Sequence, residues 1–186
     1  TLSAGTLLIN GSNAGATGAI SVASGATLGG SGSLGGALTV ADGGIFAPGN
    51  GPGTLTTTTS ASFGNASVLS YEFLGTDTSV GGANNDLFTG AINLTLDGVL
   101  NVNETVAGSF LSASLGDTWR LINYSGTFTN NTLDLGSAPA LSGGNVFAVD
   151  TSVSGQVNLV VVPETSSVGL LGLTALLTLR RRRRAA

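Results

Sequence analysis

An internal repeat constrains the fold of this chain more than any other feature of its sequence. Residues 18–28 read Gly-Ala-Ile-Ser-Val-Ala-Ser-Gly-Ala-Thr-Leu, and residues 36–46, offset by 18 positions, read Gly-Ala-Leu-Thr-Val-Ala-Asp-Gly-Gly-Ile-Phe. A weaker copy begins at Gly53, and a partial copy begins upstream at Gly5. One copy is too short to bury its own apolar face, so repeats of this kind fold by stacking on one another.

Each copy alternates apolar and polar residues and then reaches a turn that contains glycine. The alternation predicts short strands, and Gly25 and Gly43 supply the positive φ that a tight corner needs. Stacked copies of such strands form a parallel β-helix, or β-solenoid, in which like residues lie above one another. Four aliphatic side chains are then expected to point inward: Ile20, Val22, Leu38 and Val40.

Two stretches of the repeat region carry a more specific pattern. Residues 31–40 read Ser-Gly-Ser-Leu-Gly-Gly-Ala-Leu-Thr-Val, and residues 46–55 read Phe-Ala-Pro-Gly-Asn-Gly-Pro-Gly-Thr-Leu. Over residues 5–57 the chain resembles the autotransporter-associated β-strand repeat of bacterial surface proteins. The resemblance implies a right-handed β-helix whose repeats are structural and carry no catalytic residues.

Beyond the repeats the pattern changes to longer strands. Residues 68–73 and 92–96 read as strands, and Asp97-Gly98 marks a turn after the second of them. We therefore divide the chain into solenoid repeats at residues 1–65 and a β-rich continuation at residues 66–162. The continuation is expected to cap the solenoid, because the open edge of a sheet must be covered.

The chain ends in three segments of contrasting polarity. A polar spacer spans residues 163–167, an apolar run without charge spans residues 168–179, and five arginines follow at residues 180–184. An apolar run followed by positive charge predicts a short transmembrane helix with the arginines on the cytoplasmic side. A run of this length is also typical of a buried core helix, and an arginine tail also binds polyanions, so both alternatives stay open.

The same region, residues 163–186, resembles the PEP-CTERM sorting signal of Gram-negative bacteria. Pro163 and Glu164 match the first two positions of its motif, and Thr165 replaces the usual second proline. Ser166 and Ser167 match the small polar residues that commonly follow. The resemblance implies that exosortase, a membrane enzyme, cuts the chain within this motif. The cytoplasmic anchor then consists of Arg180, Arg181, Arg182, Arg183 and Arg184.

The composition excludes several kinds of chemistry. The chain has no cysteine, histidine, lysine or methionine, so it contains no disulfide, thiolate nucleophile, histidine base or His/Cys metal site. Nine of the ten acidic residues precede Pro163, where Arg120 is the only basic residue, so this part carries a net charge of about −8. Such a surface repels phosphates, and we expect no nucleic-acid partner and no cofactor. The chain starts at Thr1 without an export signal, which predicts a mature form or a fragment.

A pair of carboxylates is the catalytic arrangement that this composition still allows. Asp77 and Asp86 flank a polar loop, and Glu72 lies nearby. Two such carboxylates are the catalytic groups that a glycosidase needs. The acids are scattered singly beside glycine, asparagine or threonine, however, and that distribution is typical of turns. We therefore predict no enzyme activity and no catalytic residue.

Two binding roles are considered in the same region. Oxygen ligands for calcium occur at Asp77, Asn84, Asn85 and Asp86. Their spacing matches neither an EF-hand nor the calcium-binding nonapeptide, so turn roles are favoured. A sugar-stacking platform is offered by Tyr71, Trp119 and Tyr124. Each of these aromatic residues lies in an apolar strand, which favours packing in the core.

These observations predict an exported structural or adhesive protein of the cell surface or extracellular matrix. The all-β chain is expected to be a right-handed parallel β-helix with a β-rich C-terminal cap, followed by one short transmembrane helix. It is expected to be anchored briefly in the inner membrane and released by exosortase, with extracellular polysaccharide as a further partner. The alternative is a stalk segment of a larger carbohydrate-active enzyme whose catalytic part lies upstream of residue 1. An autotransporter passenger fragment is a third interpretation, disfavoured because the last residues lack alternating amphipathic strands.

Overall fold

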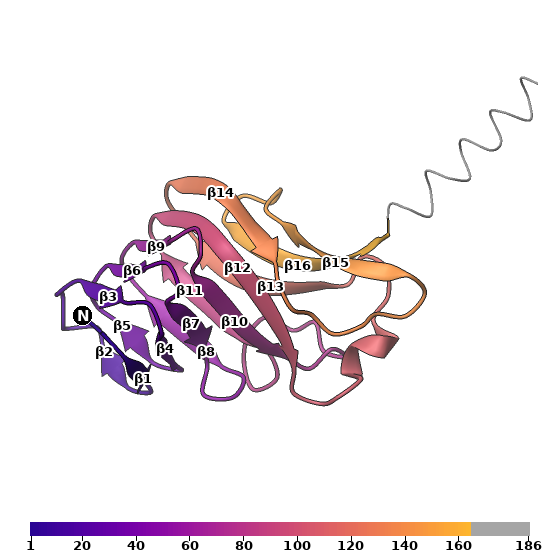
Figure 1. Ribbon diagram of the computed structural model, residues 1–186, viewed down its shortest axis with the longest axis horizontal. Helices are drawn as coiled ribbons and strands as arrows, with labels where there is room; N and C mark the ends of the chain where they lie inside the picture. The colour runs from indigo at the N-terminus through magenta and orange to yellow at the C-terminus, as the bar shows by residue number, and fades with distance from the viewer. Residues whose placement is uncertain (165–186) are drawn as a thin grey trace, which may run out of the picture.

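The computed structural model describes residues 1–164, and residues 165–186 lie outside the described part. The described residues form two β-sheets and one short 3-10 helix, Ser109–Ser112. The body is elongated, with the N-terminal strands at one end and the last two strands toward the other (Figure 1). Side chains alternate between core and solvent along most strands, because each sheet covers the core with one face only.

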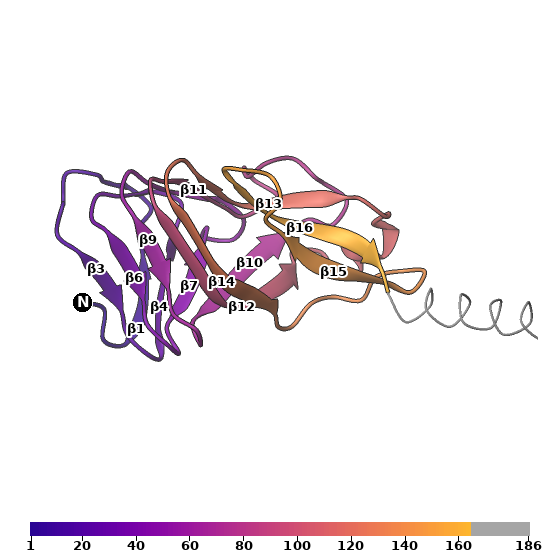
Figure 2. The same ribbon diagram turned by 90° about the horizontal axis from the view of Figure 1, so that it is seen from above.

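The first sheet has nine strands, and all of its pairings are parallel. In spatial order its strands are β1 (Gly5–Leu8), β4 (Ala26–Gly30), β7 (Ile45–Pro48), β10 (Val68–Phe73), β12 (Leu94–Glu104), β9 (Ala61–Phe63), β6 (Leu38–Val40) and β3 (Ile20–Val22). Strand β14 (Phe128–Leu135) pairs with β12 beside this path. Because β12 pairs with both β10 and β9, the sheet bends round into a half-barrel (Figure 2).

The second sheet has seven strands and mixed pairing. In spatial order they are β2 (Ser12–Asn13), β5 (Ser33–Leu34), β8 (Thr54–Thr57), β11 (Leu87–Ala91), β13 (Thr118–Tyr124), β16 (Gln156–Pro163) and β15 (Asn145–Asp150). Pairing is parallel from β2 to β13 and antiparallel from β13 through β16 to β15. Among the named strands of residues 1–164, antiparallel pairing is therefore confined to β13, β16 and β15.

The two aligned repeat copies lie side by side in the nine-stranded sheet. Ile20 pairs with Leu38 and Val22 pairs with Val40 between β3 and β6. Val22, Leu38 and Val40 are buried, Ile20 is half-buried, and Thr39 between the buried pair is exposed. Like residues thus stack along the sheet, which is what the alternation in the sequence predicts.

Aromatic side chains fill the core between the sheets. Phe46 of β7 packs edge to face on Phe63 of β9 and on Phe88 of β11, with ring centroids 5.3 and 4.9 Å apart. Nearer the C-terminal end, the ring of Phe110 lies 4.9 Å from that of Trp119 and 5.0 Å from that of Phe147. Phe46 and Phe63 come from the nine-stranded sheet and Phe88 from the seven-stranded sheet, so their contacts join the two sheets into one core. Phe110 packs the 3-10 helix against β13 and β15.

The described residues are all-β, as expected, but the predicted right-handed parallel β-helix is wrong. A regular right-handed parallel β-helix keeps its rows of strands in separate sheets, whereas the 11-residue strand β12 joins the β10 and β9 rows into one curved sheet. The expected turn at Asp97-Gly98 lies inside this strand, because the inward apolar positions continue on both sides of it, from Leu94 to Val102. Antiparallel strands, rather than a simple cap, complete the other sheet.

The predicted C-terminal transmembrane helix is not supported either. No helix within residues 1–164 is long and apolar enough to cross a membrane. The predicted helix at residues 168–179 and the arginine tail at residues 180–184 lie outside the described residues. The domain boundaries drawn from the sequence stay predictions.

Candidate binding groove

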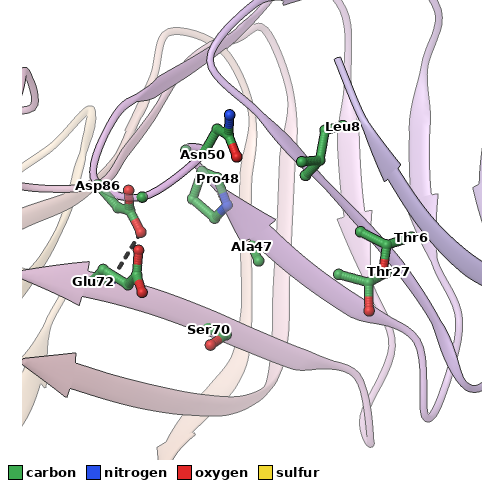
Figure 3. Close-up of a pocket in the computed structure, with 11 residues that line it drawn as sticks. Thr6, Leu8, Thr27, Ala47, Pro48, Asn50, Ser70, Glu72 and Asp86 are labelled. Atoms are coloured by element: carbon green, nitrogen blue, oxygen red, sulfur yellow. Dashed lines mark hydrogen bonds between the residues drawn. The ribbon is translucent and has the colours of Figure 1, made fainter. Parts of the chain in front are cut away.

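A groove of about 230 Å³ crosses the outer face of the nine-stranded sheet, where β1, β4, β7 and β10 lie side by side (Figure 3). Most of its walls are small, hydroxyl-bearing or acidic, with apolar surface supplied by one leucine, one alanine and one proline. The lining residues are Thr6, Leu8, Thr27, Ala47, Pro48, Gly49, Asn50, Gly51, Ser70, Glu72 and Asp86.

The strand register brings the polar side chains of the groove together. Thr6 of β1 pairs with Thr27 of β4, so their outward side chains lie next to each other. On β10 the alternate residues Ser70 and Glu72 are half-buried and line the groove, while the residues between them enter the core. Hydroxyl and carboxylate groups therefore face the same space from three strands.

Glycine at position 29 keeps the floor of the groove low. A Cβ at Gly29 would lie 2.3 Å from the carbonyl oxygen of Ala47 and 3.1 Å from Cδ2 of Leu8. The first clash is with main chain, so rotating a side chain cannot relieve it. A larger residue here would have to push β4 and β7 apart.

Asp86 closes one end of the groove. Its carboxyl oxygens accept the main-chain N–H groups of Gly53, at 2.8 Å, and of Glu72, at 2.7 Å, the latter drawn as the dashed line in Figure 3. The residue is 1% exposed. Asp86 thereby ties the turn at residues 49–53 to strand β10, and the groove keeps its shape because both walls share this side chain.

The electrostatics of Asp86 follow from its burial. Burial raises the pKa of Asp86 to about 8, the N–H donors of Glu72 and Gly53 oppose the rise, and the Glu72 carboxylate adds to it. Burial also raises the pKa of the Tyr71 phenol, and the charge of Asp86 raises it further. The Tyr71 hydroxyl has no hydrogen-bond partner among the described residues. Asp86 is thus mainly protonated at neutral pH and has a structural role.

The groove can offer hydrogen bonds to a polyhydroxylated ligand. Glu72 accepts hydrogen bonds, and the hydroxyls of Thr6, Thr27 and Ser70 both donate and accept. Asp86 is a poor acid–base partner for Glu72, because both of its oxygens are engaged with main chain. Within residues 1–164 there is no group of three His, Cys, Asp or Glu side chains that could hold a metal ion.

The predicted calcium ligands instead fix the loop that precedes β11. The carboxylate of Asp77 accepts the side-chain N–H of Asn84, at 2.7 Å, and the main-chain N–H of Ser79, at 2.8 Å, and these two bonds lower the pKa of Asp77. Asn85 donates to the main-chain oxygens of Asp77 and Ser79, each at 2.9 Å. Asp77 bonds within its own loop while Asp86 bonds elsewhere, so the two acids considered as a catalytic pair do not share a site.

The three aromatic residues considered as a sugar platform do not form one. Tyr71 and Trp119 are fully buried, and the Trp119 indole N–H donates to the main-chain oxygen of Asp77 at 2.7 Å. Tyr124 is half-buried and stacks on Phe128, with ring centroids 4.7 Å apart. Packing and hydrogen bonding inside the body account for all three.

Only the start of the predicted processing motif lies within the described residues. Pro163 is the last residue of β16 and pairs with Asn145, and the N–H of Glu164 donates to the carbonyl oxygen of Gly144 at 3.2 Å. The remaining motif residues, Thr165, Ser166 and Ser167, and the predicted anchor, Arg180 to Arg184, lie outside the described residues.

The groove was not predicted from the sequence. Thr6, Thr27 and Ser70 occupy outward positions of alternating strands, so the repeat register carried a signal for their alignment. The burial of Asp86 had no such signal, because it depends on a turn more than 30 residues away in sequence closing over the carboxyl group.

Comparison with known proteins gives one informative match. No family model matches this chain. Over 122 residues, or 66% of its length, the chain is 48% identical to the protein named "Adhesin BmaC autotransporter" from Brucella suis biovar 1 (strain 1330), of whose length it spans 3%. The match supports, at a coarse level, the predicted resemblance to autotransporter-associated repeats and the predicted adhesive protein of the cell surface. The sorting signal stays a prediction.

Proposed function

We propose that this chain is an adhesive segment of an exported protein of the cell surface or extracellular matrix. The observation that carries the proposal is its 48% identity over 122 residues to an autotransporter adhesin. The elongated body suits this role, because in-register parallel strands hold one another by main-chain hydrogen bonds along its length. We expect the protein to act by binding rather than by catalysis, and without nucleic acid as a partner.

We assign adhesion to the groove on the nine-stranded sheet, which would bind a sugar of the attachment surface. Its hydroxyls and the Glu72 carboxylate match the hydroxyl groups of a neutral sugar, and Leu8 and Ala47 offer apolar surface to the face of a sugar ring. A small open groove binds one sugar weakly, so useful attachment would come from many copies acting together.

We further propose that the C-terminal residues direct the chain to the surface. An exosortase-type enzyme would cut within residues 163–167, while the apolar residues 168–179 contact the membrane and Arg180 to Arg184 stay on the cytoplasmic side. The position of Pro163 supports this arrangement, because it is the last residue of β16, the last strand within residues 1–164. A cut beyond it would leave both sheets intact.

Sugar binding by the full-length chain tests the groove. Ala47→Leu adds bulk on the groove surface, and we expect it to weaken the affinity for a neutral oligosaccharide by about tenfold, as a clash with one ligand group would. Thr39→Leu is the matched control, because Thr39 also points outward from the same sheet but does not line the groove. A glycan array would identify the oligosaccharide, and calorimetry would measure Kd. Equal binding by both variants would remove the groove from the proposal.

A further inference from the structure

Arg120 stands apart from the charge pattern of the body. It is the only Lys or Arg residue before the C-terminal tail, in a part of the chain with nine acidic residues. It lies on β13 of the seven-stranded sheet, between the buried residues Trp119 and Leu121, and is itself half-buried with an outward side chain. The groove described above belongs to the other sheet, so Arg120 marks a separate face.

Two neutral amides hold the guanidinium in place. Its Nε donates to Oδ1 of Asn158 at 2.7 Å, and its Nη1 donates to Oδ1 of Asn123. Among residues 1–164 it has hydrogen bonds to these amides and no ion pair with a carboxylate. Partial burial lowers the pKa of Arg120. A partly desolvated cation without a counter-ion is electrostatically unfavourable, so an external anion would gain from binding here.

A row of polar side chains leads away from Arg120 along the same sheet. The side-chain N–H of Asn123 donates to Oγ1 of Thr89 at 3.5 Å. Thr89 pairs with Thr56, and Thr56 pairs with Ser33, in parallel register. All are half-buried and outward-facing, and neighbouring strands lie about 4.8 Å apart, so their polar groups form a regular row.

Asp150 marks the opposite side of Arg120. Asn158 pairs with Arg120 on one side and with Asp150 on the other. The N–H of Ser152 donates to the Asp150 carboxylate at 2.9 Å and lowers its pKa, so this acid is ionised at neutral pH. Its charge repels an anion from the Asn158 side and leaves the Thr89 side as the favourable approach.

We propose that Arg120 and the row formed by Asn123, Thr89, Thr56 and Ser33 bind an acidic polysaccharide. The guanidinium pairs with a sugar carboxylate, for which its planar donor geometry is well matched. The hydroxyl and amide groups of the row bond the hydroxyls of the sugars that follow. This inference rests on the proposed adhesive function and names a ligand class for a second face of the same body.

Oligogalacturonate and its methyl ester are suitable probes, because the ester removes the charge of the sugar carboxylate and adds only a methyl group to it. The full-length chain is measured beside a full-length variant with Arg180 to Arg184 replaced by glutamine, since the arginine tail binds polyanions by itself. In both chains we expect Arg120→Gln to weaken oligogalacturonate binding by about tenfold or more, as expected for a charge-assisted contact. The ester is expected to bind weakly and to be insensitive to the substitution.

Two further variants separate recognition from structural support. Arg120→Lys keeps the positive charge but loses the planar pair of guanidinium donors, so we expect an intermediate affinity for oligogalacturonate. Thr89→Ala leaves the cation in place and should cost less, and circular dichroism verifies that each variant folds. The proposal is overturned if the ester binds as tightly as the acid, or if the Arg120 and Thr89 variants bind like the parent chain.

These binding measurements, set beside a test of whether cells that express the chain attach to a surface, keep this site distinct from the adhesive role itself. A chain that binds oligogalacturonate through Arg120 but attaches to no surface would remove the adhesive function and leave the site. A chain that attaches through the groove with no dependence on Arg120 would remove the site and leave the function.

Discussion

The Asp86 side chain holds the glycine-rich turn at residues 49–53 close to the end of strand β10. Its Oδ1 accepts the N–H of Gly53, and a Cβ at Gly49 would lie 2.3 Å from the same oxygen. Gly49 also has φ of +98°, a region that other residues rarely adopt. The Ala-Pro-Gly-Asn segment at residues 47–50 therefore has glycine at its third position for two local reasons, curvature and close approach to a buried carboxyl.

The buried carboxyl also makes stability depend on pH. Folded Asp86 keeps its proton up to a pKa of about 8, whereas an unfolded aspartate releases it near pH ~4. Between these values the unfolded state binds fewer protons, so the free energy of unfolding should fall as pH rises, by at most about 1.4 kcal/mol per pH unit. Above pH ~8 both states have released the proton and this contribution to the slope ends.

Asp86→Asn should flatten that slope, because its amide does not titrate. The variant also loses one acceptor, so we expect it to be less stable at acidic pH by about 1–3 kcal/mol. Urea unfolding at several pH values measures both effects. Asp134→Asn on the exposed side of β14 is the matched control and should keep the slope. A slope that survives Asp86→Asn would contradict the account of this carboxyl.

At the level of strands, β12 shows where sequence patterns succeed and fail. Alternation agrees with the burial of Leu94 and Leu96, because a strand buries every second residue whatever its partners. It fails at Ile92, which belongs to the predicted strand at residues 92–96 but is 47% exposed and precedes β12. It could not indicate that β12 pairs with both β9 and β10, because strand pairing depends on tertiary contacts. The turn expected at Asp97-Gly98 is wrong for the same reason. Gly98 has φ of +99° at a register shift with β14, inside a continuous strand.

The aromatic contact between strands of the two sheets gives the second stability test. Phe46 is fully buried between Phe63 and Phe88, so Phe46→Ala should lower the free energy of unfolding by about 3–5 kcal/mol through a cavity that neighbours cannot fill. Leu111→Ala is the control, since Leu111 is 53% exposed and should change stability by about 0.5 kcal/mol or less. Chemical denaturation distinguishes them, and similar losses for both would contradict the assigned core.

At the scale of the whole molecule, the composition excludes several kinds of chemical site but does not identify the two binding faces. The absence of cysteine and histidine excludes thiolate nucleophiles, histidine bases and His/Cys metal sites within this chain, because such sites need those side chains. That the scattered acids are not catalytic stays a prediction. The groove and the Arg120 face arise where outward residues of separate strands meet. Their positions depend on how the sheets curve, which local patterns do not encode.

The C-terminal proposal has a test of its own at this scale. We expect chain recovered from the cell surface to end between Pro163 and Ser167, without the arginines at residues 180–184. Mass spectrometry of the C-terminal peptide measures this directly. Protein recovered from the same place with its tail intact would rule out processing, while leaving the binding sites on residues 1–164 to be judged separately.

Attachment of whole cells tests the adhesive claim most directly. Bacteria that express the full-length chain are compared with otherwise identical cells that express the Ala47→Leu or Thr39→Leu chain, on surfaces coated with the oligosaccharide found by array, and surface amounts are equalised by antibody labelling. The account expects cells with the full-length chain and with Thr39→Leu to attach, and cells with Ala47→Leu to lose most of that attachment. Attachment that is the same with all three chains, or no higher than in cells without the protein, would contradict it.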